Sequence, residues 1–194
     1  MSTVREFSTL ESCPRLLRIL LLCLLPLLLA EIVVADERQY PETVPRVDLD
    51  RYVGTWYEIA RLPNSFQRQC SGNVTADYRR LDDGNIGVVN RCIDKNGGLD
   101  EAHGVARVVD KSTNAKLEVS FVSIFGWRLF WGDYWILYLD DDYTHVVVGT
   151  RNRRYAWILA RAPTLSAPAR DRCRRILQRA GYDPDELIDT RQTQ

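Results

Sequence analysis

The chain has 194 residues, of which 45% are hydrophobic and 27% are charged, so it is long enough for one globular domain with a buried core. Lys and Arg together number 26, as do Asp and Glu, and the formal net charge is zero. A chain without excess positive charge lacks the basic surface that nucleic-acid binding requires, so this class of function is excluded.

The N-terminal segment contains an uninterrupted apolar run, Ile19–Ala30, which follows several arginines. The run is shorter than the roughly 20 residues that a transmembrane helix needs, and Pro26 would break such a helix. A charged start, an apolar middle and small residues before residue 36 are typical of a secretory signal peptide. We therefore predict a signal peptide over residues 1–35, cleaved after Ala35, and a Pro-containing linker over residues 36–46. The alternative is an uncleaved anchor over Leu16–Ala35.

Residues 47–194 form the predicted folded domain, and most of it alternates short strands with turn signals. A short turn over residues 47–52 precedes the first strand, Gly54–Arg61, which is rich in aromatic and β-branched residues. Further strands are predicted over residues 74–78, 86–92, 104–109, 116–121, 133–139, 146–150 and 155–161. Eight strands in roughly 110 residues favour one closed barrel, which can hold a small ligand.

The pattern changes after Pro163, where apolar residues recur at helical spacing from Pro168 to Ala180 and Gly181 ends the run. Five arginines surround this predicted amphipathic helix. They form either a solvated face, which we favour, or a face for membranes and acidic lipids. Residues 183–194 are predicted to be a tail or a final edge strand.

Three features of the chain together resemble the lipocalin family: Gly54 with Trp56, the turn Asp140–Tyr143, and the strand Trp157–Arg161. The runs GTWYEIARLP, VTADY, KLEVSF and AWILARAP resemble the branch that holds bacterial lipocalins, apolipoprotein D and plant temperature-induced lipocalins. The resemblance implies an all-β fold, an eight-stranded antiparallel up-and-down β-barrel with a C-terminal α-helix packed outside. It also implies that Gly54, Trp56 and Arg161 close the barrel floor, with the guanidinium stacked on the indole.

A barrel of this kind implies a site for a fatty ligand, which needs a concave apolar pocket with a few polar groups near its mouth. Alternation along the strands, together with the inward Trp and Tyr of the family, predicts these ligand-binding residues: Glu58, Ala60, Val74, Ala76, Tyr78, Leu117, Val119, Phe121, Tyr134, Ile136, Tyr138, Val147 and Trp157. A buried carboxylate needs a partner, and for Glu58 we expect a hydrogen-bond network with tyrosines.

The sequence offers little support for catalysis. Its two histidines, His103 and His145, lack metal-ligand spacing, and no phosphate-binding loop or nucleophile elbow is present. We therefore predict no catalytic residue, no metal and no cofactor.

The cysteines beyond the leader are Cys70, Cys92 and Cys173. An exported protein meets oxidising conditions, and three cysteines leave one unpaired. We predict a disulfide between Cys70 and Cys92, for which Ser71-Gly72 must bend the chain back. The competing pair, implied by relatives, joins Cys70 to Cys173.

By resemblance, the protein is expected to carry or store a fatty acid, lysophospholipid or similar small amphiphile, in the service of envelope lipid maintenance. It would be secreted or periplasmic, with outer-membrane or membrane-surface association and homodimer formation left open. Cys23 lies inside the apolar run, which departs from the lipid-anchored bacterial lipocalins. The alternatives are an enzyme acting on a lipid or isoprenoid, and a scaffold for a protein partner.

Overall fold

The computed structural model describes residues 40–193, and the predicted signal peptide, its cleavage site and the alternative anchor lie outside them. Ten strands precede the main helix: β1 Gly54–Arg61, β2 Cys70–Arg80, β3 Ile86–Asp94, β4 Leu99–Val108, β5 Lys116–Ser120, β6 Val122–Ile124, β7 Trp127–Leu129, β8 Gly132–Leu139, β9 His145–Gly149 and β10 Ala156–Ala160. The other elements are the helices α2 Leu49–Tyr52 and α3 Ala167–Arg179, the 3₁₀ turn η1 Pro184–Glu186, and the short strand β11 Ile188–Asp189.

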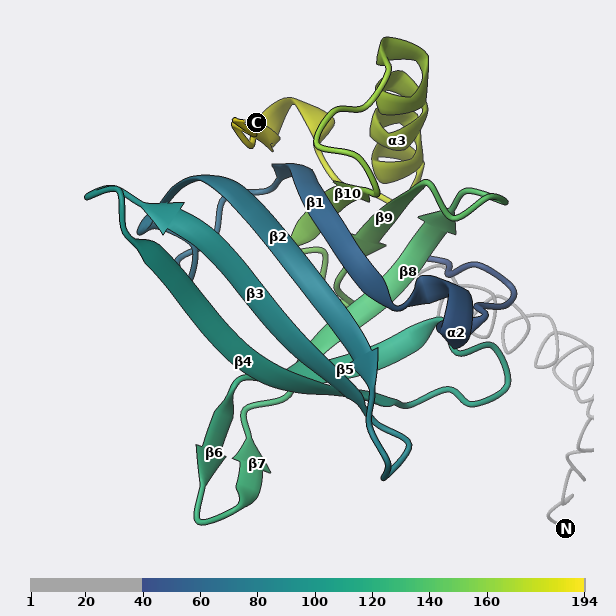
Figure 1. The fold of residues 1–194 in the computed structure, drawn as a ribbon. Helices are drawn as coiled ribbons and strands as arrows, with labels where there is room; N and C mark the ends of the chain where they lie inside the picture. Colours follow the sequence, from purple (N-terminus) through teal and green to yellow (C-terminus); the bar gives the residue numbers. More distant parts are fainter. Residues whose placement is uncertain (1–39, 194) are drawn as a thin grey trace, which may run out of the picture. The chain divides into compact units, whose positions relative to one another are not determined.

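The main sheet closes on itself as an antiparallel barrel (Figure 1). Its neighbours run in the order β1-β2-β3-β4-β5-β8-β9-β10, and β10 returns to pair with β1. Strand β11 adds to β1 outside this closed set, and β6 pairs only with β7. The predicted all-β, eight-stranded barrel with an external C-terminal helix is therefore confirmed.

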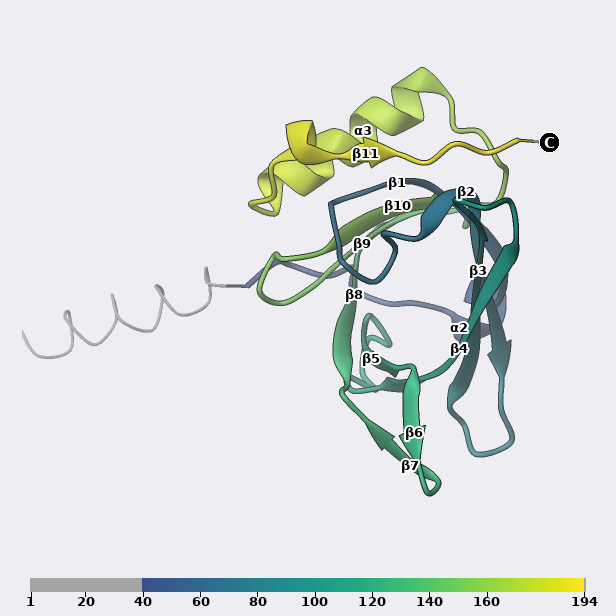
Figure 2. The same ribbon diagram turned by 90° about the vertical axis from the view of Figure 1, so that its left-hand side faces the viewer.

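The two ends of the barrel differ. Helix α2 lies across one end, which we call the floor, and Asp48 caps it by accepting hydrogen bonds from the backbone amides of Asp50 and Arg51. Figure 2 looks onto the opposite end, which we call the mouth, with the strands arranged in a ring and the β6–β7 hairpin extending from the rim. The loops after β1, β3, β5 and β9 lie at the mouth.

Two separate apolar clusters hold the fold together. One fills the barrel interior toward the floor and includes Trp56, Ile136 and Leu159, while the other lies between the barrel wall and α3. Strands β8, β9 and β10 are therefore apolar on both faces, which explains their nearly continuous runs of apolar residues. Helix α3 ends where predicted. Gly181 has a φ of +85°, and the amides of Gly181 and Tyr182 donate to the carbonyl oxygens of Gln178 and Leu177.

Part of the predicted linker contacts the barrel. The amide of Val44 donates to the carbonyl oxygen of Ile136 at 2.9 Å, and the ring of Tyr40 packs edge-on against Trp135. The compact unit reaches back to Tyr40. Among residues 40–193, no helix combines the length and the apolar character needed to cross a membrane.

Candidate functional site

The candidate site is the interior of the barrel. Pairing registers and the inner apolar cluster place these predicted residues on the inward face: Glu58, Ala76, Tyr78, Leu117, Val119, Tyr134, Ile136 and Trp157. Val74 is also buried and lies two residues before Ala76 on β2. Although they face inward, Ala76, Val119, Tyr134 and Trp157 keep part of their surface exposed. Solvent therefore reaches the interior of the barrel.

A bulge in β1 moves Ala60 out of the predicted site. Glu58 pairs with Leu159, but the next pair along β1 joins Ala60 to Ile158, so Ile59 is the extra residue. Because one inserted residue reverses the alternation of side chains, Ala60 lies on the outer face, in the cluster beneath α3. The prediction that Ala60 lines the interior is wrong.

A second bulge, between Ile136 and Tyr138, has the same effect on β8, and the pairing across it places Val147 of β9 on the outer face too. Ile136 pairs with Val148, whereas Tyr138 pairs with Val147, and Leu137 is the extra residue. Tyr138 and Val147 both belong to the outer cluster under α3. They do not line the interior, and the inward residue of β9 at this level is Val148.

Phe121 marks the mouth end of the inward face of β5 and β4. It follows the end of β5 and is part-exposed at the rim, where its ring covers the backbone of Gly104. A Cβ atom at residue 104 would come within 2.8 Å of this ring, so glycine is required for the close approach. Gly104 pairs with Val88 of the inner cluster, so Phe121 lies against the inward face of Gly104, at the mouth end of the interior.

Three tyrosines form a hydrogen-bonded cluster above the floor. The hydroxyls of Tyr52 and Tyr134 are 2.7 Å apart, and that of Tyr78 donates to Tyr134 at 3.0 Å. Burial raises the pKa of Tyr78 to about 12 and raises the pKa values of Tyr52 and Tyr134 well above 10. Sequence analysis assigned Tyr78 and Tyr134 to the site but did not single out Tyr52, which belongs to the turn that caps the floor.

This tyrosine cluster predicts a steep loss of stability in alkali. The unfolded chain loses its tyrosine protons near pH 10, whereas the folded pKa of Tyr78 is about 12. The stabilisation is therefore fully present below pH 10 and is lost as the pH rises through the folded pKa values. We expect phenolate absorbance and loss of tryptophan fluorescence to appear together during a pH titration. Tyr134→Phe should make the transition less steep, and an unchanged slope would contradict the coupling.

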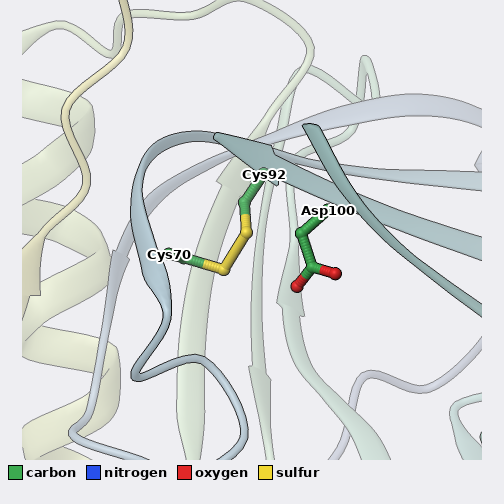
Figure 3. A group of neighbouring side chains, drawn as sticks. All are labelled: Cys70, Cys92 and Asp100. Carbon is green, nitrogen blue, oxygen red and sulfur yellow. A yellow bond between two sulfur atoms is a disulfide. The ribbon is translucent and has the colours of Figure 1, made fainter. Parts of the chain in front are cut away.

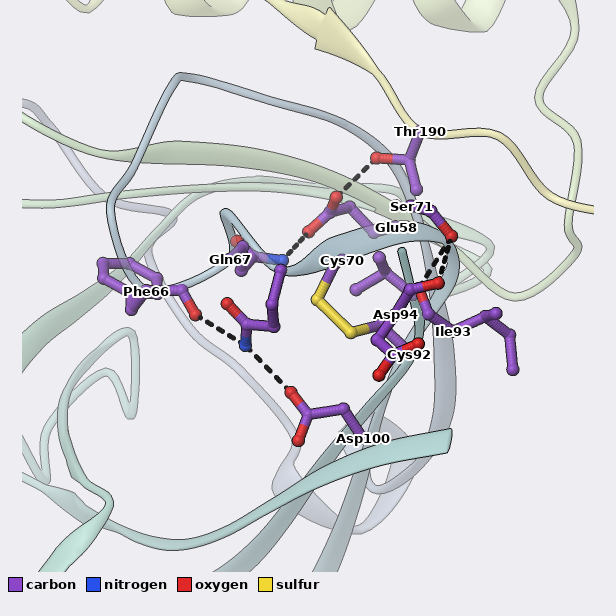
Figure 4. The surroundings of a disulfide bond; sticks show 12 residues. Glu58, Phe66, Gln67, Cys70, Ser71, Cys92, Ile93, Asp94, Asp100 and Thr190 are labelled. Atoms are coloured by element: carbon purple, nitrogen blue, oxygen red, sulfur yellow. Dashed lines mark hydrogen bonds between the residues drawn. A yellow bond between two sulfur atoms is a disulfide. The ribbon is translucent and has the colours of Figure 1, made fainter. Parts of the chain in front are cut away.

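A polar network surrounds Glu58 nearer the mouth, and Figure 4 shows its hydrogen bonds with Gln67 and Thr190. Its carboxylate accepts hydrogen bonds from Arg61 Nη1 at 2.8 Å, from Gln67 Nε2 at 2.8 Å and from the hydroxyl of Thr190. Gln67 Oε1 in turn accepts from the indole of Trp157 at 3.1 Å. The expected tyrosine partners of Glu58 are thus replaced by Arg61, Gln67 and Thr190.

Sequence analysis missed Arg61, as well as Gln67 and Thr190. Arg61 pairs with Trp157 across β1 and β10, and its side chain is only 13% exposed. Its Nε atom is buried and has no hydrogen-bond partner among residues 40–193. A buried donor without a partner is costly, and it can be satisfied by an acceptor group on a bound molecule.

The predicted disulfide joins Cys70 to Cys92, with 5.6 Å between their Cα atoms, and Cys173 is free and buried. This prediction is confirmed. The bond can form because an irregularity of β2 between Cys70 and Gly72 brings the chain back toward β3. Asp100 lies beside the bridge and accepts from Gln69 Nε2 at 2.9 Å (Figure 3). Both sulfurs are used in the bond, so this group has no thiolate with which to hold a metal.

The histidines and the free cysteine lie away from the interior. His103 is exposed on β4, and His145 is buried on the outer side of β9, with its ring tilted by 53° against that of Tyr138. Burial raises the pKa of the Cys173 thiol to about 12, so the reactive thiolate is absent at neutral pH.

Comparison with known proteins agrees with this architecture. Residues 47–192 match the family model of the lipocalin-like domain. The chain belongs to the lipocalin family. It is 40% identical over 157 residues to the outer membrane lipoprotein Blc of Vibrio cholerae, covering 78% of this lipocalin and 88% of the relative. Temperature-induced lipocalin-1 of Arabidopsis thaliana is 35% identical over 163 residues, with 81% and 86% covered. Apolipoprotein D of Mus musculus is 31% identical over 159 residues, with 78% and 80% covered.

Solved structures show the same fold. Insecticyanin of Manduca sexta superposes with a TM-score of 0.64 at 22% identity, over 79% of this lipocalin and 85% of insecticyanin. Lobster apocrustacyanin A1 gives 0.62 at 16% identity, over 80% and 91% of the two chains. At these sequence identities the similarity shows only that the fold is shared.

Proposed function

We propose that this lipocalin is an extracytoplasmic carrier or store for a fatty acid, a lysophospholipid or a similar small amphiphile, in the service of envelope lipid maintenance. The observation that carries the proposal is the gradient along the barrel interior. Apolar side chains line the wall above the floor, and a polar group of Glu58, Arg61 and Gln67 lies beside Trp157 nearer the mouth. Such a gradient fits a ligand with an acyl chain and one polar head.

The polar group of Glu58, Arg61 and Gln67 can bind the polar head of such a ligand. Arg61 is neutralised by Glu58, so the network as a whole carries little net charge, while Arg61 Nε still offers a buried donor. A carboxylate, phosphate or ester oxygen can accept from it at little cost in desolvation. We therefore propose that the acyl chain lies toward the tyrosine floor and the head lies at the level of Arg61 and Trp157.

Binding, rather than catalysis, suits the chemistry of the interior. No histidine of the described chain faces inward, and the thiol of Cys173, a buried residue of α3, lies outside the barrel. Membership of the lipocalin family likewise supports a binding protein for small hydrophobic molecules. The matches span four-fifths or more of the length of each relative named above. One of these relatives is an outer membrane lipoprotein, which supports our proposal that this lipocalin resides in the envelope. We propose export by a signal peptide over residues 1–35 and a barrel domain over residues 47–194.

The affinity should follow acyl-chain length. Burying a chain of about fourteen methylenes is worth roughly 11 kcal/mol gross. Lost freedom and polar desolvation remove several kcal/mol of this, which leaves micromolar affinity or somewhat better. Mass spectrometry of lipid extracted from the purified protein, followed by titration with a series of saturated fatty acids, measures both the natural ligand and the dependence on chain length.

Trp157→Ala is expected to weaken fatty-acid binding by about tenfold, because it removes an aromatic wall of the interior and the indole donor to Gln67. Trp135→Ala is the matched control. The Trp135 ring contacts Tyr40 and Lys116 on the outer side of the barrel, so its loss should leave the affinity unchanged. Equal affinities for the parent and Trp157→Ala, or affinity that ignores chain length, would show that the ligand does not occupy this interior.

A further inference from the structure

The loop between β5 and β8 forms a hairpin that sequence analysis did not predict. We call residues 121–130 the mouth hairpin. Strands β6 and β7 pair only with each other, and the two-residue turn Phe125-Gly126 joins them. Figures 1 and 2 show the hairpin extending away from the rim of the mouth. Neither of the two apolar clusters that stabilise the fold includes a residue of this hairpin.

The mouth hairpin exposes an unusual concentration of large apolar side chains. Phe125 is 99% exposed, Phe130 80% and Trp127 76%. Their exposed neighbours on the same hairpin are Phe121, Val122, Ile124 and Leu129. The pairs Val122–Leu129 and Ile124–Trp127 share one face, and Ser123–Arg128 takes the other. Contiguous exposed apolar surface of this kind marks an interaction site.

Backbone conformation supports a functional origin for these aromatics. Phe125 and Phe130 have φ values of +50° and +55°, a region that suits glycine or asparagine and is unfavourable for a bulky side chain. Two phenylalanines therefore occupy strained positions in which neither gains burial within the chain. Strain that the fold does not need points to a role in binding.

Charge identifies the partner. The four loops at the mouth, residues 62–69, 95–98, 121–131 and 150–155, contain no acidic residue and six basic ones: Arg68, Lys95, Arg128, Arg151, Arg153 and Arg154. The three loops at the floor, residues 81–85, 109–115 and 140–144, contain six acidic residues and one lysine. Asp94, Asp100 and Asp133, at the strand ends beside these mouth loops, offset part of this charge. The mouth loops still carry positive charge and the floor loops negative charge, which favours approach of the mouth to a negative surface.

We infer that the mouth hairpin inserts into the interface of an anionic lipid bilayer and docks the barrel mouth on it. Exposed Phe and Trp at the tip of a short element, flanked by basic loops, suit the headgroup region. A protein partner of ordinary affinity needs about 800 Å² of matched surface on each side, which a narrow two-stranded hairpin does not provide. If the proposed function holds, docking lets an amphiphile pass between bilayer and barrel without crossing bulk water.

Vesicle sedimentation tests the docking. The full-length chain, as recovered after export, is mixed with vesicles of phosphatidylcholine, with and without phosphatidylglycerol. The parent should bind the anionic vesicles more tightly, and the double variant Phe125→Ser/Trp127→Ser should bind them about 100-fold more weakly, at tenfold per aromatic residue. Val109→Ser is the control, because Val109 is 57% exposed in a floor loop. Any contribution of residues 1–35 to vesicle binding is the same in the parent, the double variant and Val109→Ser, so it does not affect the comparison.

A second readout locates the hairpin directly. Phospholipids with brominated acyl chains should quench the fluorescence of the parent more than that of Trp127→Phe, even where the leader helps to hold the chain on the vesicle. Equal quenching, or equal binding of the parent and the double variant, would overturn the inference. So would a dimer in lipid-free buffer that the double variant dissociates, since the hairpin would then bind a second copy. Fatty-acid affinity in lipid-free buffer should be unchanged by the double variant, so failure of docking is distinguishable from failure of the proposed function.

Discussion

Replacing Arg161 with alanine is expected to lower the free energy of unfolding by about 3–5 kcal/mol. The guanidinium lies 3.9 Å from the centroid of the Trp56 ring. It also donates, at 2.8 to 3.0 Å, to the carbonyl oxygens of Arg51, Tyr52, Val53 and Thr55. One side chain thus holds the turn from α2 into β1 and covers the floor indole. Thermal or denaturant unfolding measures the loss.

Two further variants identify the cause. Arg161→Lys keeps the charge but cannot span four carbonyl oxygens, so it should lose an intermediate amount of stability. Arg51→Ala removes an exposed arginine that stacks 4.0 Å over Tyr143 and donates to one carbonyl oxygen, so it should cost about 1 kcal/mol or less. If Arg161→Ala were no more destabilising than Arg51→Ala, the floor would not depend on this contact.

Glycine at position 54 belongs to the same arrangement. Its φ is +99°, and a Cβ atom there would lie 3.2 Å from Nη1 of Arg161. Gly54 therefore gives the turn its conformation and leaves room for the guanidinium. The G-x-W motif and the distant arginine are parts of one contact.

Removing the disulfide by Cys70→Ala/Cys92→Ala should lower the free energy of unfolding by about 3 kcal/mol, because the bond closes a loop of 22 residues in the unfolded chain. The native position of the loop should persist. Ser71 Oγ donates to the carbonyl oxygens of Ile93 and Asp94 at 3.0 and 2.9 Å, independently of the sulfurs. Denaturant unfolding of the double variant, beside the parent, measures the effect.

A reducing agent supplies the control for this variant. It should destabilise the parent by a similar amount and leave the double variant unchanged, because the cysteine that remains among residues 40–193, Cys173, is buried and unpaired. If reduction destabilised both proteins equally, the loss would not come from the Cys70–Cys92 bond.

Local signals in the sequence were sufficient for the barrel itself. Turn residues such as Asp82–Asn85 mark hairpins because few residue types adopt their backbone angles, and the amide of Leu81 does donate to the carbonyl oxygen of Asn85. Strand β5, with one face buried, alternates clearly, and Leu117 and Val119 face inward as predicted. The helical spacing from Pro168 and the stop at Gly181 likewise follow from local chemistry.

Long-range contacts decided the polar part of the site. The partners of Glu58 include Thr190, 132 residues away in the C-terminal segment beside β11, and Gln67 in the loop after β1. Neither residue carries a sequence signal for this role, because a hydroxyl or amide can bond any nearby polar group. The mouth hairpin was missed for another reason. Its apolar residues are exposed, whereas the reading of sequence patterns assumes that apolar residues are buried.

The sequence by itself determined the number of barrel strands, most of their turns and the external helix, and its resemblance to lipocalins implied the floor contact between Trp56 and Arg161. Only the tertiary structure decided which side chains of β1, β8 and β9 line the interior. Where α3 covers the barrel, the strands are apolar on both faces, so alternation no longer distinguishes inside from outside. Bulges at Ile59 and Leu137 then reverse the phase without leaving a polar residue as a marker. Ala60, Tyr138 and Val147 therefore face α3. Burying their apolar side chains stabilises the fold equally well on either face of the sheet, so the sequence pattern could not assign them to one face.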